Sequence, residues 1–118
     1  MKILESYNTQ IWVGLRVGYT DEVHTLDDVR DLCDQYVNEI KDCVTITPTE
    51  FRYVYGNEPG VIVGYINYPR FPRSQEEIYD RTLQLAEILM YGLGQNRVSI
   101  TTPDRSIMLE AEKPDEKG

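Results

Sequence analysis

The sequence predicts an α+β fold in which a largely antiparallel sheet carries two helices on one face. Three observations indicate this class. Several segments alternate apolar and polar residues, two others have apolar residues at every third or fourth position, and 41% of the 118 residues are apolar. A chain of this length suits a single domain, which we expect to span residues 1–110, followed by a mobile acidic tail over residues 111–118.

The first half of the chain predicts a strand and then a helix. Residues 11–19, IWVGLRVGY, alternate strictly, and KILES (residues 2–6) is expected to add a short edge strand before them. Thr25 is a candidate N-cap, with Asp28 in the capping-box position three residues later. The apolar stripe of the helix that follows consists of Leu26, Val29, Leu32, Cys33, Tyr36, Val37 and Ile40.

Three strands are expected in the middle of the chain. CVTITP (43–48) and FRYVYG (51–56) are separated near Pro48, because proline interrupts a strand ladder. GNEPG (56–60) has the composition of a reverse turn. VIVGYINY (61–68) is apolar on both faces, which is typical of a strand in the interior of a sheet.

A second helix and a hairpin complete the predicted order. Ser74 and Glu77 form an S-x-x-E capping box, and Gly92 or Gly94 is expected to end the helix. Its buried stripe comprises Ile78, Thr82, Leu85, Ala86, Leu89, Met90 and Leu93. RVSITT (97–102) and IMLE (107–110) then form a hairpin, so the expected order βαβββαββ is of the ferredoxin-like type.

Two helices on one face leave the other face of the sheet open. Trp12, several tyrosines and several glycines are expected there. An apolar face of this kind is usually covered, and a second copy of the chain can cover it. We therefore expect a homodimer or a higher homo-oligomer.

The composition excludes several classes of partner and suggests a location. The net charge of −8 argues against long nucleic acids, which need a basic surface. No apolar run approaches the roughly 20 residues of a membrane span, and the first residues lack a signal-peptide pattern, so we expect a cytoplasmic protein. Cys33 and Cys43 match no zinc or redox spacing and are interpreted as buried thiols.

Catalytic and metal-binding motifs are not found in the sequence. His24 is the one histidine, and no P-loop or dinucleotide-binding turn is present. Glu50, Glu58 and Asp104 are expected at strand ends, where catalytic carboxylates can lie, but turn and capping roles also explain them. We therefore expect no metal, no cofactor and no enzymatic activity.

The stretch YPRFPR (68–73) predicts a site for a small nucleotide. Aromatic rings can stack on a base, and arginines can hold phosphate. The stretch also directly precedes a helix N-terminus, where backbone N–H groups attract anions. A similar set of polar residues lies on the last hairpin. The residues expected to bind the ligand are Tyr68, Arg70, Phe71, Arg73, Asn96, Thr102, Asp104 and Arg105.

Other interpretations of the same residues remain open. YPRFP can act only as a hydrophobic staple for the helix, with Phe71 buried. The acidic face around Asp27, Asp31 and Asp34 can block a basic surface of a host protein, which would make the chain an acidic inhibitor. A small phosphodiesterase or cyclase, with a carboxylate near the sheet end, is a third hypothesis.

Three segments resemble a known phage family. GNEPGVIVGYINYPRFP (56–72), VSITTPDRSIMLE (98–110) and VGLRVGYTDEVHT (13–25) are similar to the first family of anti-Thoeris signal sponges. The resemblance implies an oligomeric protein in the cytoplasm of an infected bacterium. Such a protein binds a cyclic ADP-ribose isomer, in some members also cyclic oligonucleotides, and holds it without cleavage.

Overall fold

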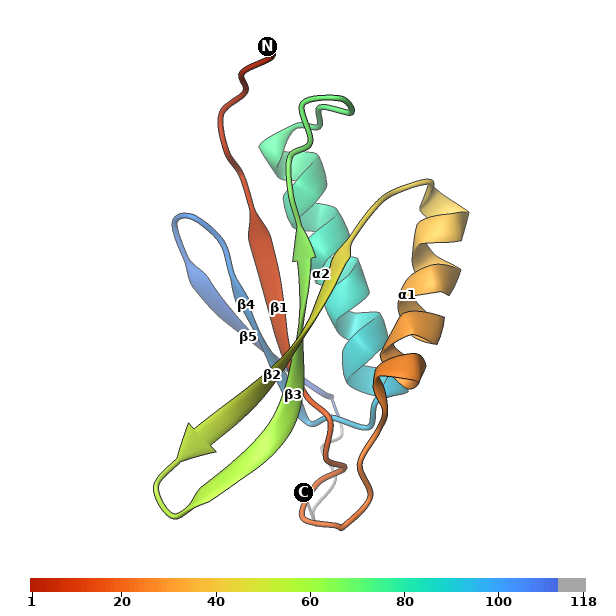
Figure 1. Cartoon of the computed structure of the whole chain (residues 1–118), viewed down its shortest axis with the longest axis vertical. Helices are drawn as coiled ribbons and strands as arrows, with labels where there is room; N and C mark the ends of the chain where they lie inside the picture. The colour runs from red at the N-terminus through yellow and green to blue at the C-terminus, as the bar shows by residue number, and fades with distance from the viewer. Residues whose placement is uncertain (113–118) are drawn as a thin grey trace.

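The computed structural model describes residues 1–112 and confirms the α+β class (Figure 1). The elements follow in the order β1 (Thr9–Gly14), α1 (Leu26–Ile40), β2 (Thr45–Tyr53), β3 (Gly56–Tyr65), α2 (Gln75–Gly92), β4 (Arg97–Thr101) and β5 (Ser106–Glu110). All five strands form one sheet in the order β2-β3-β1-β4-β5, and all neighbouring strands are antiparallel. Each helix connects two parallel strands across one intervening strand, and the preference for right-handed crossovers puts both helices on one face.

Side-chain caps begin both helices where the sequence predicts. The Thr25 hydroxyl accepts from the backbone N–H of Asp28, and the Asp28 carboxylate accepts in return from the N–H of Thr25 at 3.0 Å. That second bond, together with the contact to His24, lowers the pKa of Asp28. At α2 the Ser74 hydroxyl accepts from the N–H of Glu77, and the helix ends before Gly94, whose φ is +63°.

The core lies between the sheet and the two helices. Leu85 and Leu89 of α2 have no exposed surface, and neither do Ile11 and Val13 of β1. Burying each such side chain contributes about 1.5–3 kcal/mol. Gly92 lets α1 approach α2, because a Cβ there would lie 2.7 Å from Leu32 Cδ1. Packing of these apolar faces therefore holds the two layers together.

The middle of the chain forms two strands where we expected three. Pro48 lies inside β2, which tolerates it because β2 is an edge strand. The expected turn GNEPG belongs to β3, and the chain reverses at Val54 and Tyr55, where Tyr55 has a φ of +62°. Cross-strand pairing over residues 45–64 therefore outweighs the local turn propensity of glycine and proline.

The ends of the first predicted strand also differ from the expectation. KILES forms no strand, and β1 ends at Gly14, after which Arg16 pairs with Val23 in a single bridge.

Ala111, the first residue of the expected tail, is buried, and its N–H donates to the carbonyl oxygen of Asn96 at 2.8 Å. Residues 113–118 of that tail lie outside the described part of the chain.

Within residues 1–112, no other element covers the face of the sheet opposite the helices. Trp12, Phe51 and Ile62 lie on it half-buried, and Met108 of β5 is 57% exposed. Phe51 lies over Gly60, where a Cβ would come within 2.2 Å of the ring. The β2–β3 hairpin extends beyond the rest of the sheet in Figure 1, and its tip exposes Tyr53, Val54 and Tyr55.

Removing the cap of α1 tests its contribution to stability. Thr25→Ala is expected to lower the free energy of unfolding by about 1 kcal/mol, because the backbone N–H of Asp28 loses its hydroxyl acceptor. Urea denaturation followed by circular dichroism measures the change. Asp34→Ala, on the exposed side of the same helix, is the control and should not lower stability. Equal stability of Thr25→Ala and the parent chain would contradict the assigned cap.

Candidate functional site

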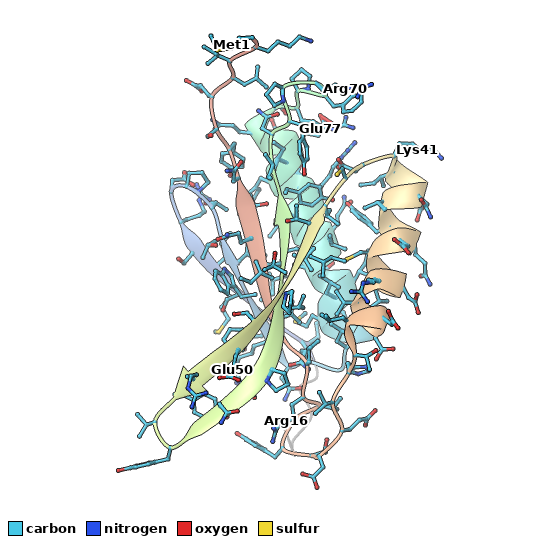
Figure 2. The ribbon with its side chains drawn as sticks, viewed as in Figure 1. Met1, Arg16, Lys41, Glu50, Arg70 and Glu77 are labelled. Carbon is cyan, nitrogen blue, oxygen red and sulfur yellow. The ribbon has the colours of Figure 1, made fainter. Side chains whose placement is uncertain are left out.

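A pocket opens beside the first turns of α2, and we call it the α2 pocket. Its walls are the loop between β3 and α2 on one side and the connection from α1 to β2 on the other. The hollow measures about 160 Å³. Figure 2 shows Lys41, Arg70 and Glu77 at this end of the molecule. The apolar and aromatic lining of the α2 pocket comes from Tyr65, Ile66, Tyr68, Phe71 and Ile78.

Tyr65 brings a buried hydroxyl group to this pocket. The residue is 3% exposed, and its hydroxyl group has no hydrogen-bond partner among the described residues. The Tyr36 hydroxyl lies near it but donates to Gln84 Oε1 at 2.8 Å. Burial raises the pKa of Tyr65 far above its ordinary value, so the group stays protonated. An unpaired hydroxyl of this kind is costly unless a ligand or water bonds to it.

Ion pairs fix the charged walls of the α2 pocket. Arg81 Nη1 lies 2.8 Å from Asp42 Oδ2, and Arg81 Nη2 lies 3.2 Å from Glu77 Oε1. Arg73 Nη1 donates to the same Glu77 oxygen at 3.1 Å, and Arg73 Nη2 donates to the carbonyl oxygen of Lys41 at 3.4 Å. The bond to Asp42 raises the pKa of Arg81. Glu77 therefore joins the two arginines and does not close the expected capping box.

The aromatic residues of the loop form the outer part of the pocket. Phe71 is 62% exposed, and the Arg70 guanidinium lies over its ring at 5.3 Å from the centroid. The staple interpretation, which needs Phe71 buried, is therefore wrong. Cys43 Sγ donates to the Tyr68 hydroxyl at 3.7 Å, and this bond raises the pKa of Tyr68. The rim thus presents two rings that a planar ligand can contact.

The two cysteines lie in different surroundings. Cys33 is buried in α1, and burial raises the pKa of its thiol to about 11. Cys43 is exposed at the edge of the α2 pocket. The interpretation as buried thiols is confirmed for Cys33 and wrong for Cys43.

The predicted residues of the last hairpin lie on another side of α2. Arg105 lies over the ring of Tyr79 at 5.6 Å from the centroid. The Thr102 hydroxyl is bonded to Asp104 Oδ1 at 2.8 Å and accepts from the backbone N–H of Arg105. These three residues organise the turn between β4 and β5, beside a shallow hollow that Gln75 also borders. Arg70 and Arg105 therefore do not contact the same pocket within one chain.

Asn96 lies at the other end of the molecule. It follows the C-terminus of α2, whereas Tyr68, Phe71 and Arg73 lie near its N-terminus. Eighteen helical residues span about 27 Å at 1.5 Å per residue. The structure therefore brings three of the eight predicted residues into the α2 pocket, places Arg70 on its rim, and separates the other four.

The predicted site left out six of the nine residues that line the α2 pocket. Lys41 and Asp42 lie 23 or more positions before Tyr65 in the sequence, and only the fold brings them to the same pocket. The sequence contained one local indication that Asp42 could belong to the site, because Asp42 follows the end of an amphipathic helix and precedes a strand. Such connections meet at one end of a split βαβ fold.

Comparison with known proteins shows a shared fold. No family model matches the chain, and no curated protein matches its sequence. A solved structure of a phage SAM lyase in the apo state is 19% identical, covers 92% of each chain and has a TM-score of 0.73. A phage SAM lyase in complex with S-methyl-5'-thioadenosine is 15% identical, covers 93% of each chain and has a TM-score of 0.72.

This likeness corrects the expectation that the chain lacks enzymatic activity. Both similar structures are named as lyases, so the fold is one on which enzymes are built. A short chain without a recognisable catalytic motif had suggested a pure binding protein. The resemblance to phage proteins is supported at the level of the fold, because both structures come from phage proteins.

Two further observations concern metals and membranes. Residues 1–112 contain no group of three or more His, Cys, Asp or Glu side chains that could hold a metal ion. No helix in that range is long and apolar enough to cross a bilayer.

A double-mutant cycle tests the ion pair at the pocket wall. Arg81→Met and Asp42→Asn are expected to show a coupling energy of about 1–2 kcal/mol, because both side chains are largely shielded from water. Urea denaturation of the parent, the single and the double variants measures it. The exposed pair of Arg30 and Asp27 is the matched control, with about 0.3–0.5 kcal/mol expected. Equal coupling in the two pairs would show that the Asp42 pair has no special structural role.

Proposed function

We propose that the chain is a small enzyme that binds an adenosyl compound in the α2 pocket and cleaves SAM (S-adenosylmethionine). The observation that carries the proposal is a pocket with an aromatic rim that Tyr65 also lines, a residue whose buried hydroxyl has no hydrogen-bond partner within residues 1–112. Adenosine offers a flat base for Tyr68 and Phe71 and polar atoms that can bond to Tyr65. The fold shared with two phage SAM lyases supports the same ligand class.

The charges in the pocket suit the other half of this substrate. SAM carries a sulfonium cation, which aromatic faces attract, and an α-carboxylate, which a cationic side chain can hold. Tyr68 and Phe71 offer the faces, while Lys41 and Arg73 offer the cations. Arg73 is already oriented by Glu77, so little ordering entropy opposes binding to it.

A lyase reaction that leaves S-methyl-5'-thioadenosine needs no cofactor. The bond between sulfur and the γ-carbon breaks, and its electrons convert the sulfonium to a neutral thioether. The substrate carboxylate can attack the γ-carbon and close a lactone, so atoms and charges balance within one molecule. Because opposite charges disappear on the way, an apolar pocket favours the transition state over the charged reactant. The protein's role is then to hold the substrate folded for attack.

Conversion of SAM tests the proposal directly. The parent chain is expected to release S-methyl-5'-thioadenosine faster than buffer alone, as liquid chromatography of the nucleoside products measures. Phe71→Ala is expected to lower kcat/KM by roughly 10-fold, because one stacking contact is worth about 1–3 kcal/mol. Tyr91→Ala is the matched control, since Tyr91 is also half-exposed but lies at the other end of α2. No product above the buffer rate would refute the lyase proposal.

A cyclic ADP-ribose isomer, as the resemblance to anti-Thoeris proteins implies, is a second candidate ligand. Tyr68 and Phe71 could take its adenine, and Arg73 with the first turn of α2 could take its phosphates. Competition with SAM for the α2 pocket distinguishes the two ligands in the same assay. A role in overcoming bacterial defence, in the cytoplasm of an infected cell, rests on that resemblance and on the phage origin of the similar structures.

We also propose that a second copy of the chain covers the open face of the sheet. Trp12, Ile62 and Met108 supply apolar contact area there. Light scattering coupled to gel filtration should give a mass at least twice 13.7 kDa. Ile62→Glu should shift the mass toward the monomer, because the new carboxylate would be desolvated in the interface. A monomer mass for the parent chain at high micromolar concentration would contradict the proposal.

A further inference from the structure

A second hollow lies at the end of the sheet away from the α2 pocket, and we call it the Glu58 hollow. Arg16, Glu58, Gln95 and Arg97 line it, and it measures about 190 Å³. An adjoining hollow shares Glu58 and Gln95 and adds the rings of Trp12 and Phe51. Figure 2 shows Arg16 at the end of the molecule opposite Arg70 and Glu77.

The amide group of Gln95 is held in one orientation. Its Nε2 donates to the carbonyl oxygen of Arg16 at 2.8 Å and to that of Leu93 at 3.1 Å. Both amide hydrogens are therefore used, and Oε1 is left as an acceptor above Gly14. A Cβ at Gly14 would lie 3.1 Å from Gln95 Oε1 and 3.2 Å from Glu58 Oε1. Two acceptor oxygens thus converge over a residue that has no side chain.

Three charged side chains line the hollow, and Arg97 pairs with Glu110 at 3.3 Å, whereas Glu58 and the Nε of Arg16 have no such partner within residues 1–112. The half-buried Glu58 carboxylate forms no ion pair or hydrogen bond within residues 1–112. The Nε of Arg16 is buried and also lacks an acceptor. A carboxylate and a guanidinium that line the same hollow usually pair, and here they lie more than 4 Å apart. Both therefore retain hydrogen-bonding capacity for a ligand that carries both charges.

We propose that the Glu58 hollow binds the zwitterionic head of a small α-amino acid. The ammonium group lies over Gly14 and donates to Glu58 and Gln95 Oε1, which need a cationic donor between them. The carboxylate lies against Arg16, with Arg97 beside it. An apolar side chain then points toward Trp12 and Phe51. A simple anion would be repelled by Glu58, and a hard metal ion would find too few oxygen ligands.

Three methionine derivatives serve as probes, because a thioether makes favourable contacts with aromatic rings. Isothermal titration should show saturable binding of L-methionine. N-acetyl-L-methionine, which lacks the ammonium group, and L-methionine methyl ester, which lacks the carboxylate, should each bind roughly 10-fold more weakly or worse. Equal affinity of all three probes would overturn the proposal, and so would a lack of saturable binding by L-methionine at millimolar concentration.

Two substitutions locate the site. Glu58→Gln keeps the shape of the side chain and should weaken L-methionine binding roughly 10-fold or more. Gly14→Ala should weaken it also, because the new methyl group occupies the position between the two acceptors. Glu50→Gln is the control, since Glu50 lies on the neighbouring strand and pairs with Arg52. Circular dichroism confirms that each variant is folded. Unchanged affinity in Glu58→Gln would refute the proposed role of this carboxylate.

The proposal stands apart from the lyase activity. It rests on Arg16, Glu58 and Gln95, whereas SAM cleavage is assigned to the α2 pocket at the other end of the molecule. Phe71→Ala should therefore leave L-methionine binding unchanged while it lowers SAM cleavage. Loss of L-methionine binding in Phe71→Ala would place the amino acid in the α2 pocket and overturn the assignment to the Glu58 hollow.

Discussion

The ion pair between Arg81 and Asp42 is the constraint on which the α2 pocket depends. Arg81 also contacts Glu77, and Glu77 pairs with Arg73, so one chain of charges links α2 to the loop before it and to the connection from α1 to β2. These segments form opposite walls of the pocket. Because both partners of the pair are largely shielded from water, loss of Arg81 leaves the charge of Asp42 uncompensated. The pocket is thus organised before any ligand enters.

Within residues 1–112, the buried side-chain polar atoms without a partner lie toward the two ends of the molecule, and the buried hydroxyl groups of the core are paired. Among the described residues, the Tyr65 hydroxyl has no hydrogen-bond partner at one end, and Arg16 Nε has none at the other. In the core, the Thr82 hydroxyl donates to the carbonyl oxygen of Ile78. The Thr9 hydroxyl bonds to the Thr82 hydroxyl at 2.7 Å. Buried polar groups without partners are uncommon in folded proteins, so both ends are credible ligand sites.

Local sequence patterns predicted the helices well and the strands less well. The helix features depend on neighbours within four positions, so the sequence alone predicts them. They are the stripe of Val29, Cys33 and Tyr36 and the caps at Thr25 and Ser74. The turn at Val54 and Tyr55 depends on the register between β2 and β3, which involves residues up to 19 positions apart. Glycine and proline in GNEPG suggested a turn that cross-strand pairing overruled.

The sequence by itself determined the α+β class, the two amphipathic helices and the aromatic and basic character of residues 68–73. Only the tertiary structure decided which of those residues share a pocket. Phe71 and Arg73 meet Asp42 and Tyr65 because the first crossover ends and the second begins at the same end of the sheet, while the length of α2 carries Asn96 to the opposite end. Contacts between distant segments follow from sheet order and helix length, and local sequence patterns do not predict them.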